Sequence, residues 1–294
     1  QFKVVRDPNV RALKLINSEL DLIQGSMPPE TAAWLAGRAE TVVESYAGDT
    51  FTYLGINHQH PVLSKHAVRA AIAHGIDRQA IATHLFAGRA TTANRVFPEG
   101  HWLGSASSNA YEYDPDKARQ LLRGFSPDTL KFSYKTSTDP LRLRVAAVIK
   151  AQLEAIGIAI DIQSFDWATF YSDVRNGRFD LYSLSWTGLR LPDFYRQAFH
   201  SESVPPNGVN RGRYRNAEVD QLLDEATRAV TAREQLTLYT GMGNFLAEDL
   251  PYIPLWFEKH VVARRVEIAS YRTRLSGGYA ALNAVSKKWG RHGN

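Results

Sequence analysis

Hydrophobic and polar positions alternate most regularly between residues 130 and 186, where strand-like and helix-like periods follow one another. A period of two indicates a strand, and apolar residues spaced three and four apart indicate a helix. Asp139 and Asp166 are typical helix starts, while Gly157 and Gly177 are typical helix ends. We therefore expect the order β-α-β-α-β, with strands at 130–135, 158–165 and 179–186 and helices at 139–157 and 166–177. Such an order favours parallel strands joined by right-handed crossovers.

The flanking segments carry weaker periods and complete a mixed α/β chain. The N-terminal residues predict a strand from Phe2, a helix from Asn9 to Asn17 and a short strand at 21–23. Ser64 is the expected N-cap of the next helix. Further helices are expected at 64–74, 78–87, 114–124, 216–230 and 233–250, loops at 89–113 and 187–215, and a β-prone segment at 252–265.

Composition narrows the classes of function. The chain has 294 residues and no cysteine, so it is long enough for a sizeable core but has no disulfides, thiolate nucleophiles or Cys-ligated zinc. Its net charge of +5 is spread along the chain without a long basic block, which does not indicate nucleic-acid binding. No run approaches the roughly 18 apolar residues of a membrane span.

The segment SLSWTGLRLPDFYRQAFHS, residues 183–201, follows a predicted strand and gathers polar and aromatic side chains. Ligands of open α/β sheets bind beyond the C-terminal ends of the strands, so this position favours a binding site. Its main candidates are Trp186, Arg190 and Asp193. Each has an alternative role: Trp186 as core packing at the sheet edge, Arg190 as a solvated loop residue, and Asp193 as the N-cap of the segment after it.

Two other groups of residues could bind a metal or a solute. His58 and His60 would point the same way on a strand, but a zinc site needs three or four ligands and the sequence identifies no further one. Asn210, Arg211 and Arg213 form a polar loop, whose Asn and Gly residues turn geometry explains equally well. The sequence has no nucleophile elbow, phosphate-binding loop or dinucleotide fingerprint, so we expect no catalytic residue, no metal site and no cofactor.

Four landmarks in the chain carry a resemblance to a known family. They are VRAAIAHGIDRQAIATHLFAGRA (68–90), EYDPDKARQLL (112–122), FDLYSLSW (179–186), and RYRNAEVDQLLDEA (213–226) followed by LPYIPLWF (250–257). In order and approximate spacing they are similar to the C-terminal portion of the extracytoplasmic solute-binding proteins of ABC importers. The family is the peptide/dipeptide/nickel-binding one, bacterial solute-binding protein family 5.

The resemblance implies a periplasmic-binding-protein-like α/β fold, with βαβ units around a mainly parallel sheet and part of a second lobe. Residues 1–55 would end the leading part of lobe I, residues 56–260 would form lobe II, and residues 261–294 would return to lobe I, so the chain would be truncated at its N-terminus. It implies a monomeric periplasmic or extracytoplasmic receptor, with or without a lipid anchor, that binds a small peptide or peptide-like solute. The implied partners are the transmembrane subunits of an ABC permease, and no chemistry is implied. The alternative is a ligand-sensing module of a regulator, or an enzyme, built on the same lobes.

The resemblance also implies that the solute is contacted from the strand end and from the loop near residue 210. The implied contacts are Trp186, Thr187, Gly188, Leu189, Arg190, Asp193, Asn210 and Arg211. In peptide-binding relatives an acidic residue after the Trp commonly pairs with the α-ammonium of the ligand. Here Leu189 or Arg190 fills that place, and the nearest acid is Asp193. Arg190 could instead face a carboxylate or a phosphate, because a guanidinium forks onto planar anions.

Overall fold

The computed structural model describes residues 1–25, 27–104 and 111–288, and the chain divides into two compact units. Unit 1 consists of residues 1–50, 82–91 and 257–294, and unit 2 consists of residues 51–81 and 92–256. Two long strands, β2 (Thr41–Ile56) and β7 (Tyr252–Arg265), contribute residues to both units. Part of the loop expected at 89–113, residues 105–110, lies outside the described residues.

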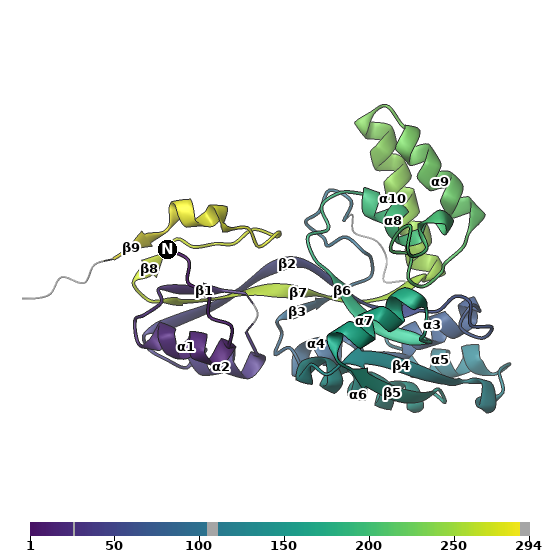
Figure 1. The fold of residues 1–294 in the computed structure, drawn as a ribbon, viewed down its shortest axis with the longest axis horizontal. Coiled ribbons are helices and arrows are strands. Elements are labelled where there is room, and N and C mark those ends of the chain that lie inside the picture. The colour runs from purple at the N-terminus through teal and green to yellow at the C-terminus, as the bar shows by residue number, and fades with distance from the viewer. Residues whose placement is uncertain (26, 105–110, 289–294) are drawn as a thin grey trace, which may run out of the picture. The chain divides into compact units, whose positions relative to one another are not determined.

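Unit 2 contains the β-α-β-α-β segment that the hydrophobic pattern predicts (Figure 1). Its strands pair in the order β5-β4-β6-β2: β4 is parallel to both β5 and β6, and residues 51–56 of β2 are antiparallel to β6. The two connecting helices both pack on β4 and β5. The elements are β4 (Lys131–Ser137), α6 (Pro140–Glu154), β5 (Ala159–Phe165), α7 (Trp167–Asn176) and β6 (Leu181–Trp186).

The ends of these helices confirm the expected capping residues. The Asp139 carboxylate accepts a hydrogen bond from the backbone N–H of Arg142 at 2.9 Å. The Asp166 carboxylate accepts from the N–H groups of Ala168 and Thr169, so each aspartate satisfies backbone donors that have no partner inside its helix. Gly177 ends α7 with φ of 72°, a left-handed conformation that glycine adopts without strain.

The remaining helices of unit 2 lie outside the β-α-β-α-β segment. The helices are α3 (His66–Gly75), α4 (Arg78–His84, partly in unit 1), α5 (Pro115–Leu122), α8 (Asp193–Phe199), α9 (Ala217–Arg228) and α10 (Ala232–Asp249), with 3-10 turns at Pro127–Thr129 and Ser201–Ser203. α9 and α10 pack against each other as a helical hairpin (Figure 1). α3 begins at His66 rather than at Ser64, whose hydroxyl donates to the Pro61 carbonyl instead of capping the helix.

Unit 1 is built on β1 (Leu22–Gln24), which pairs antiparallel with residues 262–264 of β7. A small core of Ala12, Leu15, Ile23, Leu35 and Ala263 joins this pair to the helices α1 (Pro8–Ile16) and α2 (Pro29–Ala36). Shorter elements complete it: β3 (Ala90–Thr92), β8 (Ile268–Ala269), a 3-10 turn at Tyr279–Ala284 and β9 (Ser286–Lys287).

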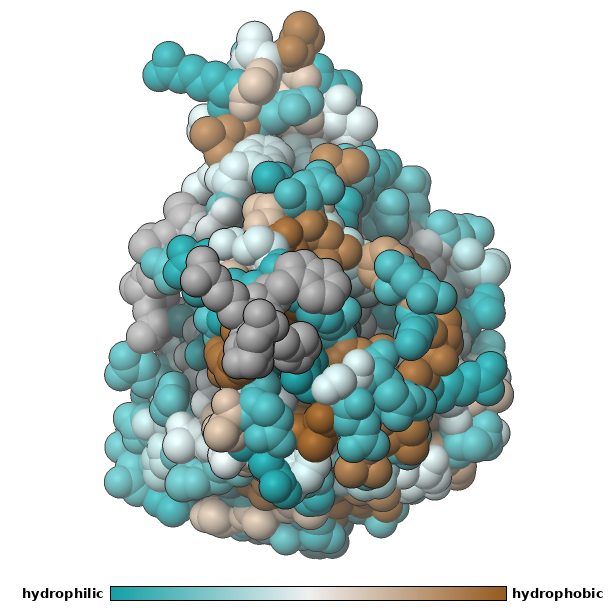
Figure 2. Space-filling view, turned by 90° about the vertical axis from the view of Figure 1, so that its left-hand side faces the viewer, coloured by the Kyte–Doolittle hydropathy of each residue, from teal (hydrophilic) through white to brown (hydrophobic). Residues whose placement is uncertain are grey.

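On the face shown in Figure 2, hydrophobic residues lie in separate groups among hydrophilic ones.

The strand expected from Phe2 is wrong, because these residues have no strand to pair with. The side chain of Arg11 donates to the carbonyl oxygens of Val5 and Arg6, which a β-ladder would otherwise use. Phe2 and Val4 remain 70% and 92% exposed. Among the described helices, none is long and apolar enough to cross a membrane.

Candidate functional site

Trp186 ends β6, and its half-buried ring lies in an aromatic environment. It stacks on Tyr53 of β2 with ring centroids 6.4 Å apart and an interplanar angle of 10°. The ring of Phe194, from α8, meets it edge-on at 5.0 Å. Tyr53 in turn stacks on Tyr252, at the start of β7, at 4.0 Å. The strand end therefore presents a row of rings contributed by three strands and one helix.

Arg211 places a positive charge inside this row. Its side chain is buried, with its Cζ atom 4.5 Å from the centre of the Trp186 ring and 5.4 Å from that of Tyr171. Its Nη1 lies 3.4 Å from the Tyr53 hydroxyl, and its Nη2 donates to the Tyr171 hydroxyl at 3.1 Å. We call Arg211, Tyr53, Tyr171, Trp186 and Tyr252 the Arg211 cluster.

Backbone contacts of the loop at residues 210–214 hold Arg211 in this position. The Asn210 amide donates to the carbonyl oxygens of His200 and Tyr214, and its oxygen accepts from the Tyr214 N–H. The carbonyl of Gly212 accepts from the N–H of His58 at 2.8 Å. A Cβ atom at residue 212 would lie 2.6 Å from the carbonyl oxygen of Ile56, so glycine permits this close approach to the end of β2. The bonds of Asn210 are those of a residue that shapes the loop.

The surroundings of Arg211 carry no negative charge. Burial raises the pKa of Tyr53 and raises that of Tyr252 well above its usual value, so both hydroxyls stay protonated at neutral pH. Throughout the part of the chain that the structure describes, no Asp or Glu forms an ion pair with Arg211. In addition, the buried Trp186 Nε1 and Tyr252 hydroxyl have no partner within hydrogen-bond distance among the residues described.

Tyr171 and its neighbour Trp167 extend the aromatic row along α7. The two rings stack at 5.7 Å with an interplanar angle of 12°, and Trp167 is 54% exposed. Sequence reasoning missed both residues, although a pair of aromatics four residues apart on one predicted helix was a usable signal. Tyr53 and Tyr252 gave no such signal, because a buried tyrosine on a strand resembles ordinary core.

The structure separates the other predicted contacts into two groups. Thr187, Gly188, Arg190 and Asp193 are exposed around the strand end, whereas Leu189 is buried. Asp193 is the first residue of α8, and the N-cap is Pro192 without a side-chain cap. The alternative role of Asp193 as an N-cap is therefore wrong, because its backbone already lies within the helix.

His58 and His60 are each engaged within unit 2. The His58 Nε2 lies 3.0 Å from the Pro251 carbonyl, and the His60 Nδ1 accepts from the N–H groups of Val62 and Leu63. Burial lowers the pKa of His58 to about 4, so its ring is neutral at pH 7. Among the described residues, no group of three or more His, Asp or Glu side chains lies close enough together to hold a metal ion.

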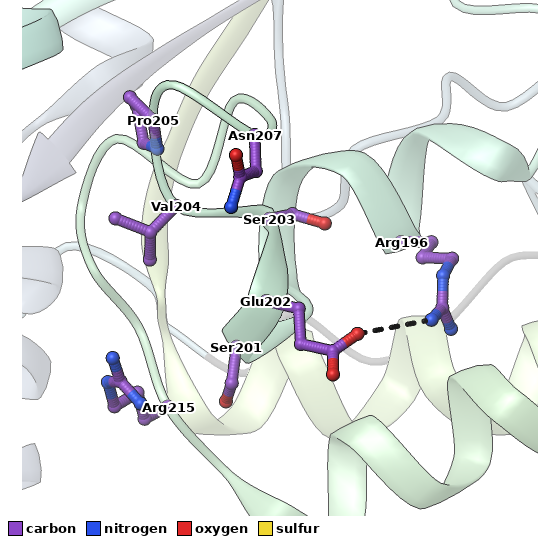
Figure 3. A pocket seen from close by; sticks show the side chains of 8 residues that line it. All are labelled: Arg196, Ser201, Glu202, Ser203, Val204, Pro205, Asn207 and Arg215. Atoms are coloured by element: carbon purple, nitrogen blue, oxygen red, sulfur yellow. Dashed lines mark ion pairs between the residues drawn. The ribbon is translucent and has the colours of Figure 1, made fainter.

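An open polar hollow of about 760 Å³ lies elsewhere in unit 2 (Figure 3). It is lined by Arg196, Ser201, Glu202, Ser203, Val204, Pro205, Asn207 and Arg215, none of which belongs to the Arg211 cluster. Acids already neutralise its Arg196, since Asp224 lies 2.5 Å and Glu202 3.9 Å from the guanidinium. Arg215, which also lines the hollow, is exposed to water, whereas Arg211 is buried.

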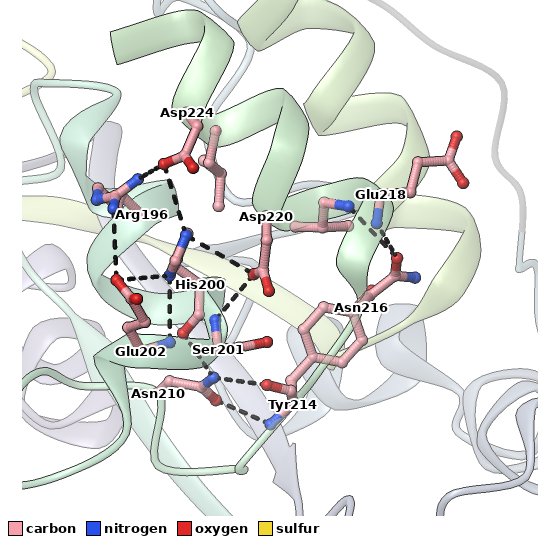
Figure 4. Close-up of polar contacts among 12 residues, drawn as sticks. Arg196, His200, Ser201, Glu202, Asn210, Tyr214, Asn216, Glu218, Asp220 and Asp224 are labelled. Atoms are coloured by element: carbon pink, nitrogen blue, oxygen red, sulfur yellow. Dashed lines mark hydrogen bonds and ion pairs between the residues drawn. The ribbon is translucent and has the colours of Figure 1, made fainter.

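A polar network beside this hollow holds α8, the 3-10 turn and α9 together (Figure 4). The buried His200 accepts a hydrogen bond from the Glu202 N–H at its Nδ1, which leaves Nε2 as the nitrogen that carries a proton. That nitrogen faces Asp224 at 3.7 Å and Asp220 at 4.0 Å, while Asp220 also accepts from the Ser201 N–H. These contacts fix the start of the loop that leads to Arg211.

Comparison with known proteins identifies the family. Residues 1–204 match the model of the middle part of the bacterial extracellular solute-binding proteins, family 5. The chain belongs to this family. The four sequence landmarks thus predicted it correctly, and the expected α/β binding-protein fold is confirmed.

Several relatives with similar sequences are described as peptide-binding proteins. Di/tripeptide-binding protein 2 of Pseudomonas aeruginosa is 29% identical over 276 residues, covering 92% of this chain and 52% of that protein. A putative ABC transporter peptide-binding protein of Brucella ovis is 32% identical over 238 residues, covering 76% of this chain and 44% of that protein. The chain therefore spans about half the length of these relatives.

Solved structures share the fold at lower sequence identity. The DppA protein of Helicobacter pylori, in complex with the peptide STSA, has a TM-score of 0.80 at 24% identity, covering 95% of this chain and 55% of that one. NikA of Brucella suis, in complex with Fe(III)-EDTA, has a TM-score of 0.84 at 21% identity, covering 97% and 61%. At these identities the comparison establishes the fold alone.

Proposed function

We propose that the protein is the solute-binding receptor of an ABC importer, that it binds peptides or peptide-like solutes, and that it delivers them to a membrane permease without chemical conversion. The observation that carries this proposal is the match of residues 1–204 to the family of extracellular solute-binding proteins. The peptide-binding descriptions of the relatives support the solute class. The receptor would act as an extracytoplasmic monomer, with or without a lipid anchor.

Within this proposal, residues 56–260 are lobe II, and residues 1–55 and 261–294 belong to lobe I. The solute contacts of lobe II come from the end of β6 and the loop at 210–214: Trp186, Thr187, Gly188, Leu189, Arg190, Asp193, Asn210 and Arg211. Leu189 would act by shaping its loop, since it is buried. Asn210 would shape the loop at 210–214, since its side chain bonds to backbone groups.

Calorimetry with di- and trialanine tests the proposal by measuring the peptide affinity of two forms of the protein. One form is the product of the complete gene, and the other is the 294-residue chain. A two-lobed receptor encloses most of the surface of its ligand, so one lobe with part of the other supplies only part of the contact. A loss of about 3 to 4 kcal/mol weakens binding by about two to three decades. We therefore expect micromolar binding by the complete product, roughly millimolar binding by the 294-residue chain, and recovery of intact peptide.

Two variants of the complete product sharpen this test. Trp186→Ala combined with Asp193→Ala should weaken peptide binding, whereas Trp34→Ala, at a partly exposed tryptophan of unit 1, should leave it unchanged. Hydrolysis of the peptide would favour an enzyme. Equal affinity of both forms, or an unchanged affinity of the double variant, would place the solute elsewhere.

A further inference from the structure

Unit 2 buries an arginine without giving it an acidic partner. Arg211 is 6% exposed, and across residues 1–25, 27–104 and 111–288 its recorded contacts are with tyrosine and tryptophan side chains. Among the other buried cations of the unit, Arg69 pairs with Asp249 and Lys135 with Asp173, while Arg78 donates to three backbone carbonyl oxygens, a contact that the Arg211 guanidinium lacks among the described residues. A buried charge is costly unless it is paired, so the unpaired state of Arg211 calls for an anion from elsewhere.

The groups around Arg211 hold it in place without neutralising it. The ring faces of Trp186 and Tyr171 attract the cation electrostatically. The hydroxyls of Tyr53 and Tyr171 supply dipoles but no charge. This arrangement orients the planar guanidinium, which is the condition for recognising a planar anion with two parallel hydrogen bonds.

Several hydrogen-bond donors of the cluster remain available. An arginine side chain has five N–H donors, and the contacts with Tyr53 and Tyr171 involve one on Nη1 and one on Nη2. Among the described residues, no acceptor lies within hydrogen-bond distance of the buried Trp186 indole N–H, and none lies within reach of the Tyr252 hydroxyl. A positive charge and unused donors in one place are complementary to an acceptor that carries negative charge.

We propose that Arg211 anchors a carboxylate group of the solute, which enters between the half-buried rings of Trp186 and Tyr171. One guanidinium balances one negative charge, so a carboxylate monoanion suits the cluster better than a phosphate dianion does. The exposed ring of Trp167, stacked on Tyr171, offers an apolar surface for the group next to the carboxylate. This inference rests on the proposed function in that the carboxylate belongs to the transported solute.

Benzoate and its neutral isostere benzamide are the probes for this site. The indole N–H resonance of Trp186 in the ¹⁵N-labelled 294-residue chain, assigned with Trp186→Phe, is followed during titration at constant ionic strength. We expect benzoate to bind saturably and about tenfold or more tighter than benzamide, because a hydrogen bond to a charged group is stronger than one to a neutral group. Arg211→Gln should abolish the difference. Arg144→Gln, the same change of charge at an exposed position of α6, should keep it.

Three results would overturn the anchor: equal binding of both probes, no saturable shift with benzoate, or benzoate binding unchanged in Arg211→Gln. Inorganic phosphate that binds at least as tightly as benzoate would overturn the carboxylate class. Arg211→Lys covers the case in which the glutamine variant does not fold. It keeps the charge but not the planar fork, so its benzoate affinity should lie below that of the native chain, and an equal affinity would also overturn the anchor.

A second titration separates this inference from the proposed function. The product of the complete gene is titrated with trialanine and with trialanine amide. Binding of both with equal affinity overturns the carboxylate anchor and leaves the peptide receptor standing. Selective binding of benzoate over benzamide, with no binding of either peptide, supports the anchor and overturns the peptide receptor.

Discussion

Arg69→Ala is the substitution that best tests how the Arg211 loop is held. Tyr214, at the end of this loop, donates from its hydroxyl to the Asp249 carboxylate at the end of α10. Asp249 also pairs with Arg69 of α3, its Oδ1 lying 2.8 Å from the Arg69 Nη2. The Arg69 guanidinium donates further to the backbone carbonyls of Asp249 at 2.7 Å and Ser64 at 2.7 Å. Alanine at residue 69 therefore removes the ion pair and leaves these carbonyls without their donor.

The expected loss of stability follows from the burial of the pair. Removing one partner of a fully buried ion pair costs about 3 to 5 kcal/mol. Arg69 has a side chain 4% exposed, whereas that of Asp249 is 25% exposed, so water partly hydrates the remaining carboxylate. We therefore expect a decrease of about 2 to 4 kcal/mol in the free energy of unfolding. This is a large share of the 5 to 15 kcal/mol, roughly, that stabilises a typical domain.

Urea unfolding followed by far-UV circular dichroism measures this loss. The matched control is Arg119→Ala, which breaks an exposed pair in the same unit with side chains 50% and 86% exposed and should cost about 0 to 1 kcal/mol. Arg69→Met combined with Asp249→Leu should cost less than Arg69→Ala, because it leaves no unpaired buried charge. If Arg69→Ala lay within about 0.5 kcal/mol of Arg119→Ala, the reasoning from burial would be refuted.

Two further predictions concern the same unit. Burial lowers the pKa of His58 to about 4, so stability that is fully present above the unfolded pKa of about 6.5 should be lost as the pH falls toward 4, by about 2 to 3 kcal/mol. Urea unfolding at pH 7.5 and pH 4.5 measures it, and His58→Gln should lose less; equal losses would show that other groups carry the effect. Gly55→Ala would place a Cβ atom 2.2 Å from the buried Tyr182 ring and should lower stability by about 2 to 4 kcal/mol, whereas Gly124→Ala, with open space around it, should not. Thermal melting compares the two glycine variants, and equal midpoints would contradict the clash.

The strands and helices of residues 130–186 could be predicted because each has local signals that agree with its packing. Asp139, Asp166 and Gly177 act at helix ends through bonds to the nearest backbone groups, which the sequence reveals directly. Strand β2 was not anticipated. Its residues 43–47 alternate between partly buried and exposed without a continuous apolar face, so pairing with a distant strand decides their conformation.

The Arg211 cluster could be predicted only in part. Trp186 and Arg211 were both named as solute contacts, but nothing in the sequence placed them together, because 24 residues lie between them and the conformation of a loop decides how closely they approach. That approach depends on Gly212 fitting against the carbonyl of Ile56 and on the amide of Asn210. Such long-range contacts are set by tertiary packing, to which hydrophobic periodicity is insensitive.

The position of Arg211 accounts for a departure of this sequence from the pattern that the family resemblance implies after the tryptophan. The family resemblance implies an acid after the tryptophan, facing the ammonium of a peptide, yet this chain has Leu189 buried in that segment. If only the acid had been lost, the strand end would be neutral. Instead, the charge next to Trp186 is that of Arg211, 4.5 Å from its ring. Since a cation at this place repels an ammonium and attracts a carboxylate, we expect a solute to present its negative end here.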